Sequence, residues 1–379
     1  DVFVNYEHLP EFLALYLKPG VISGPGLINS VASWTELDLN LKTEGMSMNG
    51  FTFTNDSLPH YLNIFLQQQP QTITFPEMLP SNTASFVFFG IEDVLTFSSD
   101  YRDLLQGLGK LQATEAKLDS MNELYSIDLE NSMLAWMGNE FGVCVTEPSS
   151  TAFAENSFAV FKARSAGLAE KLLSDIVSAI DSRKGVKTEQ QMVDSVLIRK
   201  LNIADVIPNL LGPSFQQLTD PCYMIVNGHV IFGSNISSLA EFLKYIRADR
   251  TLSKDLGFAT FAQQLGSTFN IYSYHHLSRS RYILESYLNT SSTQSFEKNL
   301  KRIRNFEAAG GQLTSTGTSF YSNVFIKYNP GWEGTEQTSW EAKMESPARI
   351  APVFVKNHVT DDVEVLVQDE KNILYLFNL

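Results

Sequence analysis

The side chains best suited to chemistry stand together in the segment FNIYSYHHL, residues 269–277. Tyr272, Tyr274 and His276 alternate along an expected strand, so their side chains share one face and form a candidate pocket wall. Packing inside a core is the alternative, and the more common role for such residues. His275 and His276 are neighbours that point to opposite faces, so they cannot chelate one metal ion together.

No pattern of a known catalytic or cofactor site occurs in the sequence. GxSxG, the P-loop, HExxH and the dinucleotide fingerprint are all missing. The other histidines have no cysteine or second histidine at ligand spacing. They are His8, His60, His229 and His358. We therefore predict no catalytic residue, no cofactor and no metal site, and expect that the chain is not an enzyme.

Two local clusters of charge are candidate binding sites. The acidic cluster comprises Asp361, Asp362, Glu364, Asp369 and Glu370, and the basic cluster comprises Lys298, Lys301, Arg302 and Arg304. A calcium loop needs a glycine at its tight turn, which the acidic cluster lacks, so a solvated hairpin edge is the better interpretation. The basic residues fall on one side of an expected helix, which favours a solvated face.

Net charge narrows the range of partners. The chain carries 28 basic and 42 acidic residues, for a net charge of −14. Nucleic-acid binding rests on Lys and Arg, and anionic membranes attract basic segments, so both partners are disfavoured. No run of residues is long and apolar enough to span a membrane.

The two cysteines, Cys144 and Cys222, both lie in apolar strand-like segments. A free cysteine there behaves as a small buried hydrophobe. Two free thiols are the preferred interpretation, and a disulfide remains the alternative because sequence alone does not place the two residues side by side.

The segment from Cys222 to Ile246 predicts a hairpin followed by a helix. Asn227-Gly228 suits the positive φ angles of a two-residue type I′ turn. Ser234 or Asn235 can cap the new helix. Apolar residues recur at helical spacing at Leu239, Phe242, Leu243 and Ile246. We expect this helix to pack on the hairpin that precedes it.

A strand, a short polar break and an amphipathic helix recur along the chain. These units start at Val2, Phe51, Phe86, Phe158, His229 and Phe269. They predict an α+β fold of repeated strand-helix or hairpin-helix units, with largely antiparallel sheets covered by helices. Ordinary α+β alternation without true repetition is the alternative. In Phe86–Phe89, successive aromatic residues point to opposite faces, so both faces of that strand should be covered.

Several local expectations concern strands. The apolar positions change from even numbers (Met46, Met48) to odd numbers (Phe51, Phe53), which predicts a β-bulge near Asn49. Three further segments are predicted as a strand over 124–129, one strand over 191–201, and an exposed meander over 311–329 that closes the domain.

Composition suggests three segments. Residues 1–75 hold the first strand-helix units, and a proline-containing polar connection precedes the main α+β domain at 76–330. Residues 331–379 comprise a turn-rich linker and a short all-β tail with three strand signals.

The chain resembles a family of uncharacterised envelope proteins, of the domain-of-unknown-function type, from Bacteroides-like bacteria. The segments that carry the likeness are VFVNYEHLPEFLALYL, SWTELDLNLKTEGMSMNGFT, LPSNTASFVFFG and VIFGSNISSLAEFLKYIRADRTLSKDLGFATFAQQL. The resemblance implies an extracytoplasmic location in the periplasm, with any membrane anchor upstream of Asp1. It also implies a propeller-like C-terminal region, of which the tail would be the first part.

Three functional hypotheses follow. The first is a non-catalytic scaffold or binding module that holds an envelope protein or another cell-envelope component. The second is a carrier of a hydrophobic ligand or lipid, suggested by the many Phe and Met side chains. The third is an unrecognised hydrolase, in which Ser, His and acidic groups converge from distant positions.

Overall fold

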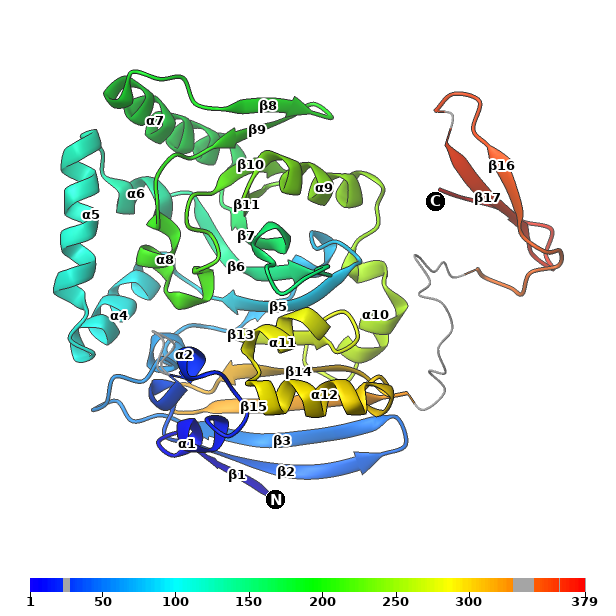
Figure 1. The fold of residues 1–379 in the computed structure, drawn as a ribbon, viewed down its shortest axis with the longest axis horizontal. Helices are drawn as coiled ribbons and strands as arrows, with labels where there is room; N and C mark the ends of the chain where they lie inside the picture. The colour runs from blue at the N-terminus through cyan, green and yellow to red at the C-terminus, as the bar shows by residue number, and fades with distance from the viewer. Residues whose placement is uncertain (23–27, 330–343, 361, 379) are drawn as a thin grey trace.

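A single large antiparallel sheet organises the protein in this computed structural model, which describes residues 1–22, 28–329, 344–360 and 362–378. Figure 1 shows this sheet running from β1 at one edge to β8 at the other. In spatial order its strands are β1 (Val2–Asn5), β2 (Trp34–Lys42), β3 (Gly45–Phe53), β15 (Phe320–Tyr328), β14 (Phe306–Ser315), β13 (Ile271–His276), β5 (Thr83–Gly90), β6 (Met137–Thr146), β7 (Ser157–Ala163), β11 (His229–Gly233), β10 (Cys222–Val226), β9 (Val196–Lys200) and β8 (Gln190–Val193).

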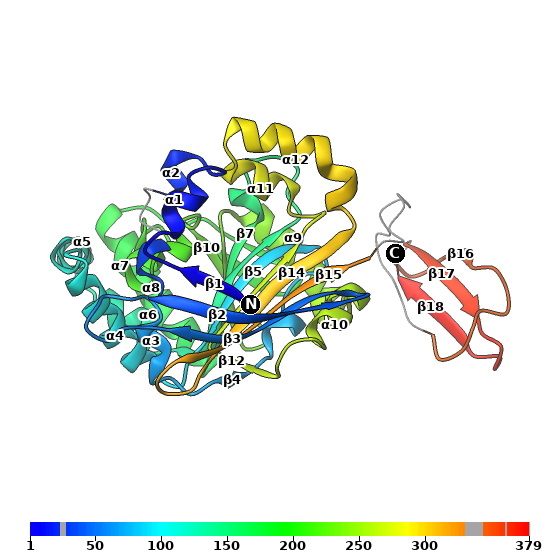
Figure 2. The ribbon, with the colours of Figure 1, turned by 90° about the horizontal axis from the view of Figure 1, so that it is seen from below.

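Helices cover both faces of this sheet, which are named here after a helix that packs on each. The α9 face carries α9 (Ile236–Arg247) and α10 (Leu256–Ala262). The α7 face carries α1 (Leu9–Leu13), α2 (Pro19–Ile22), α3 (Asn63–Leu66), α4 (Val94–Gly107), α5 (Leu111–Tyr125), α6 (Leu129–Leu134), α7 (Ala166–Lys184), α8 (Val206–Leu211), α11 (Arg281–Tyr287) and α12 (Thr290–Ile303). Figure 2 shows α1, α2, α11 and α12 on one side of the sheet and α10 on the other.

Each face of the sheet has its own hydrophobic core. Along β5, Phe89 joins the core under the α7 face, whereas Phe86 and Phe88 join the core under the α9 face. Both faces of this strand are therefore covered, as its aromatic run predicts. These observations confirm the α+β class and the antiparallel sheets covered by helices.

The hairpin-helix unit forms as predicted. Asn227 and Gly228 have φ angles of 47° and 76°, the left-handed values that this two-residue turn requires. The Asn235 side chain caps α9 by accepting a hydrogen bond from the Ser238 backbone N–H at 2.8 Å. The apolar stripe of α9 packs against its own hairpin and β9.

A helix follows the strand in each of the six predicted units, at β1, β3, β5, β7, β11 and β13. True internal repetition is a stronger claim that the arrangement does not support. The helix after β7 lies on one face of the sheet and the helix after β11 lies on the other.

Three predictions about strands were wrong, one wholly and two in part. The segment 124–129 holds the end of α5 and the start of α6. Residues 190–200 form the hairpin β8–β9, because Asp194 and Ser195 both adopt positive φ in a tight turn. The two strands of the predicted meander do form and pair, as β14 and β15, but they lie within the sheet between β13 and β3 and do not close it as an exposed edge. Their other partners are far away in sequence, so local pattern gives no sign of them.

The predicted bulge near Asn49 is also absent. The register between β2 and β3 runs without a break from Trp34 opposite Phe53 to Lys42 opposite Gly45. The change in apolar parity along β3 therefore has another cause. Met46 and Met48 face one side of the sheet, and Phe51 and Phe53 face the other.

The two cysteines are free and buried. Cys144, Phe158, Gly233 and Cys222 occupy one row across β6, β7, β11 and β10. Adjacent strands lie about 4.8 Å apart, so the two cysteines are separated by roughly 14 Å. A disulfide needs Cα atoms within about 7 Å, which excludes the bond in this fold.

The C-terminal tail forms a small antiparallel sheet of β16 (Val353–Lys356), β17 (Val363–Gln368) and β18 (Leu374–Asn378). The acidic cluster differs from the solvated edge we expected, because Asp369 is fully buried and accepts hydrogen bonds from Ser346 and Tyr375. Asp361 and most of the expected linker lie outside the described residues.

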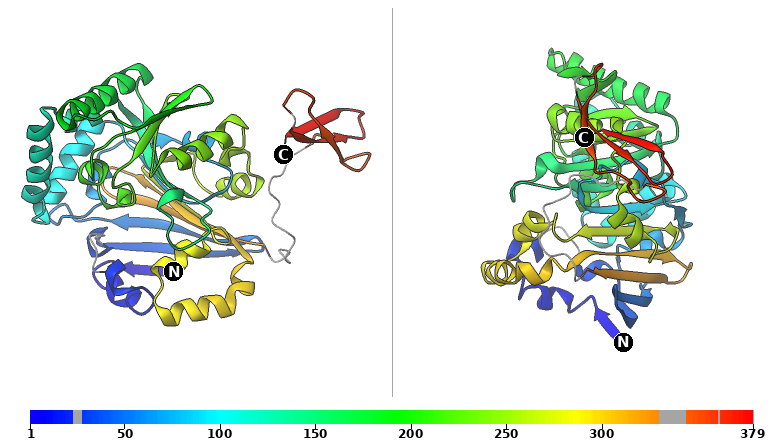
Figure 3. Two further views of the ribbon diagram at one scale, coloured as in Figure 1. Left: turned by 45° about the horizontal axis from the view of Figure 1, so that its top comes forward. Right: turned by 90° about the vertical axis from the view of Figure 1, so that its right-hand side faces the viewer.

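The division into three segments stays a prediction. Strands from residues 1–75 and from 76–330 nevertheless share one sheet, because β3 pairs with β15. Two segments that are far apart in sequence also lie side by side on the α7 face. In Figure 3 the blue N-terminal helices lie beside yellow α12, and an isolated bridge joins Leu17 to Leu288.

Candidate binding surface

The predicted pocket wall is part of a core. Tyr272 and Tyr274 are buried against Phe86 and neighbouring aromatic rings on the α9 face. His276 is partly buried on the same face, and burial lowers its pKa to about 3. Core packing, the alternative weighed from the sequence, is the role that the two tyrosines have. None of these residues lines either pocket described below.

A continuous row of aromatic side chains lies on the α9 face at the β1 edge of the sheet. This aromatic ladder consists of Phe3, Trp34, Phe53, Phe51 and Tyr321. Consecutive ring centroids are 5.5–6.4 Å apart, and the Phe3–Trp34 and Trp34–Phe53 pairs are stacked. Four of the five side chains are 42–60% exposed. A contiguous exposed aromatic patch is typical of an interaction site.

Polar side chains lie on the same face as the ladder, within its rows of cross-strand neighbours. Glu36 lies directly between Phe3 and Phe51 on neighbouring strands. The next row on the same face holds Asp38, Asn49 and Asn323. Neither row contains a lysine or arginine, so the surface offers aromatic faces together with carboxylate and amide groups.

A chain of hydroxyl groups on the opposite face fixes the register beneath the ladder. Thr52 is hydrogen-bonded to Thr35 and to Ser322, each at 2.7 Å, and Tyr6 joins the chain through Thr35 at 3.1 Å. Thr35, Thr52 and Ser322 are all buried. A one-residue slip of a strand would turn these hydroxyls outward, so the chain holds the aromatic side chains in place.

The parity change between Met48 and Phe51 is the sequence signal for this surface. The bulge predicted from it is wrong, because the strand is regular. A regular strand with that pattern must present apolar residues on both faces. One of those faces is uncovered at Phe51, and the ladder lies there.

A pocket of about 230 Å³ opens on the α7 face of β5, β6 and β13, and is called the sheet pocket. Val87, Val143 and Val145 line it from the strands, with Phe153 and Phe215 beside them. Its polar groups include Ser85 and His275, whose Oγ and Nδ1 atoms are 2.8 Å apart. Burial lowers the pKa of His275, which favours its neutral form.

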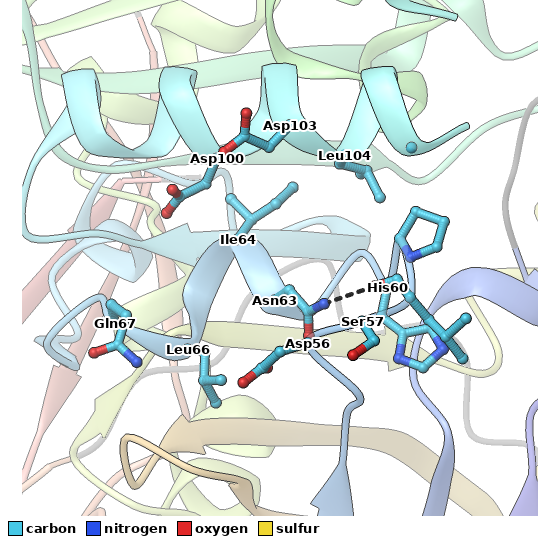
Figure 4. Close-up of a pocket in the computed structure, with 13 residues that line it drawn as sticks. Asp56, Ser57, His60, Asn63, Ile64, Leu66, Gln67, Asp100, Asp103 and Leu104 are labelled. Carbon is cyan, nitrogen blue, oxygen red and sulfur yellow. Dashed lines mark hydrogen bonds between the residues drawn. The ribbon is translucent and has the colours of Figure 1, made fainter. Parts of the chain in front are cut away.

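A second pocket of about 480 Å³ lies between residues 56–67 and α4. Figure 4 shows Asp100 and Asp103 on the helix above Asp56 and Gln67. Burial, together with the neighbouring Asp103, raises the pKa of Asp100. His60 accepts a hydrogen bond from the Asn55 backbone N–H through Nδ1 at 3.0 Å.

Two further kinds of site are missing from the described part of the chain. No group of three His, Cys, Asp or Glu side chains there is placed to hold a metal ion. Nor do those residues include a helix with the length and apolar character needed to cross a membrane.

The fold is therefore that of an α+β protein built on one long antiparallel sheet, with an exposed aromatic surface near one edge. Residues 31–327 match the family described as "Protein of unknown function (DUF3352)", and the chain belongs to that family. No curated protein and no solved structure matches the chain. The family match ends before the tail, and it supports neither the Bacteroides-type origin nor the propeller-like region named from the sequence.

Proposed function

We propose that this protein is a non-catalytic binding module of the cell envelope, and that the aromatic ladder binds an uncharged polysaccharide. The observation that carries this proposal is the exposed row of rings interleaved with Glu36. We further propose an extracytoplasmic location, where such a polymer would be met.

The chemistry of the ladder favours a polysaccharide over other partners. The C–H faces of sugar rings stack on the negative faces of aromatic rings, and sugar hydroxyls donate hydrogen bonds to carboxylates such as Glu36. The core of a protein interface is depleted of charge, whereas Glu36 lies amid these rings. Asp38 and the net charge of −14 disfavour phosphate-rich polymers and anionic lipid.

Affinity electrophoresis tests this proposal with soluble polysaccharides cast into a native gel. We expect hydroxyethyl cellulose, laminarin or glycol chitin to retard the wild-type protein. Carboxymethyl cellulose shares its backbone with hydroxyethyl cellulose but is anionic, and should not retard it. Trp34→Ala and Phe51→Ala should each abolish most of the retardation, because each removes one stacking surface.

Phe12→Ala is the matched control, since Phe12 is 57% exposed but belongs to α1 on the other face. Its migration should equal that of the wild type. If no neutral polysaccharide retards the protein, or if Phe12→Ala loses as much retardation as Trp34→Ala, the proposal is wrong. Cross-linking to an envelope protein through Trp34 would favour a protein partner instead.

A hydrophobic-ligand carrier is the second candidate function, and the apolar sheet pocket is the observation that favours it. The hydrolase hypothesis gains a Ser85–His275 pair in the same pocket. The residues that line the pocket include no Asp or Glu to orient the histidine, so we assign no hydrolytic role to the pair.

A further inference from the structure

We propose that the sheet pocket binds a small uncharged molecule with an apolar body and one polar group. The Ser85–His275 pair forms the hydrogen bond to that polar group. This inference rests on the second candidate function and specifies its ligand. It is independent of the aromatic ladder, which lies on the opposite face of the sheet.

The volume of the pocket limits the size of the ligand. An engineered apolar cavity of about 150 Å³ holds benzene, so a pocket of about 230 Å³ has room for roughly nine or ten non-hydrogen atoms. A whole membrane lipid is too large. A medium-chain alcohol or a small aromatic alcohol has the right size.

The lining of the pocket selects against charge. It consists of hydrophobic side chains together with hydroxyl, thiol and amide groups and the imidazole of His275. None of these side chains is a carboxylate, an ammonium or a guanidinium group. A charged ligand would lose its hydration without gaining an opposite charge, which disfavours its binding.

The Ser85–His275 pair supplies the polar contact. These two residues lie opposite each other on the paired strands β5 and β13, so the sheet holds both of them rigidly. When the Ser85 hydroxyl donates to Nδ1 of His275, its oxygen keeps lone pairs that can accept a hydrogen bond from a ligand hydroxyl.

The side of the pocket formed by α11 is tied to the N-terminal segment. Ile283 and Tyr287 line the pocket from α11. The Lys18 backbone N–H donates to the Tyr287 carbonyl at 2.9 Å, and the Lys18 Nζ donates to the Ser286 carbonyl at 2.7 Å. The Asn289 N–H donates to the Tyr16 carbonyl at 2.9 Å. These bonds hold α11 in place, so the pocket is formed before a ligand arrives.

The test compares 1-octanol with octanoate by saturation-transfer NMR at pH 7.5, using the full chain. The two probes share an alkyl chain of similar length and differ in charge. We expect a signal from 1-octanol and at least a tenfold weaker one from octanoate. Ser85→Ala should weaken the binding of 1-octanol about fivefold, because one neutral hydrogen bond is lost. Val87→Phe should abolish binding by filling the pocket.

Phe51→Ala is the matched control, since it alters the ladder and leaves the pocket intact. A thermal melt checks that each variant is folded, and Ser85→Ala keeps the test valid if Val87→Phe does not fold. If neither probe binds, the carrier function and this inference both fail. If octanoate binds as well as 1-octanol, the carrier function stands and the inference about charge is overturned. Binding that survives both Val87→Phe and Ser85→Ala would show that the ligand lies elsewhere.

Discussion

At the scale of single residues, side-chain parity on a strand decides what each group can do. His275 and His276 are adjacent, yet one lies in the sheet pocket and the other lies on the α9 face. That they point apart could be predicted from the two-residue period of a strand. The sequence could not predict which of the two histidines lies in a pocket, because the covering helices come from distant parts of the chain.

The depressed pKa of His276 makes stability depend on pH. Burial is the main cause of the low value, about 3, against an ordinary value of 6.5. Below pH 6.5 the His276 imidazole is therefore protonated in the unfolded chain but stays neutral in the folded chain. This contribution to stability is complete above pH 6.5 and is lost as pH falls towards 3. The loss is at most about 1.4 kcal/mol per pH unit.

His276→Gln should remove that dependence. When the pH is lowered from 7.5 to 5.0, the free energy of unfolding of the wild type should fall by up to about 2 kcal/mol more than that of the variant. Urea unfolding at both pH values measures the difference. His8→Gln is the control, because the His8 side chain is exposed. An equal difference between wild type and His276→Gln at the two pH values would contradict the prediction.

Gly142 allows β5 and β6 to approach each other within the sheet. A Cβ added there would lie 2.4 Å from the Val87 carbonyl oxygen and 2.6 Å from the Phe88 Cα. Both are backbone atoms, so the sheet itself must shift. Gly142→Ala should destabilise the protein by about 2 kcal/mol or more.

Gly167→Ala is the matched control, since the nearest atom to its added Cβ is 3.9 Å away, and alanine suits a helix better than glycine. This variant should be at least as stable as the wild type. Chemical denaturation measures both variants, and equal midpoints for the two would show that the close approach is not a constraint.

At the scale of elements, the sequence predicts the features that depend on a few adjacent residues, such as turns and helix caps. The Asn227-Gly228 turn and the Asn235 cap were predictable because each depends on a few adjacent residues. The β8–β9 hairpin was missed because Asp194-Ser195 is a weaker turn signal than Asn-Gly.

Asn235→Ala should destabilise the protein by about 1 kcal/mol, because the first turn of α9 loses the acceptor for the Ser238 N–H. Asn235→Ser should keep most of that stability, since serine is also a good cap. Urea midpoints of the two variants provide the measurement. A serine variant as unstable as the alanine variant would mean that another contact of Asn235, such as that with Glu155, is the important one.

At the scale of the whole molecule, strand order was beyond the reach of sequence patterns. β14 and β15 lie between β13 and β3, so residues near 320 pair with residues near 50. Two of the five ladder residues, Phe51 and Tyr321, come together only through this pairing. The candidate surface therefore could not be predicted from sequence. The parity of β3 indicates only that Phe51 and Phe53 face the opposite side of the sheet from Met46 and Met48.

The central claim is that the aromatic ladder is a binding surface, and fluorine NMR of the protein labelled with 5-fluorotryptophan tests it most directly. The chain has four tryptophans, and Trp34→Phe identifies the resonance of Trp34. Titration with the neutral polysaccharides should shift the Trp34 resonance and leave that of buried Trp136 unchanged. A Trp34 resonance that none of these polysaccharides moves would contradict the account.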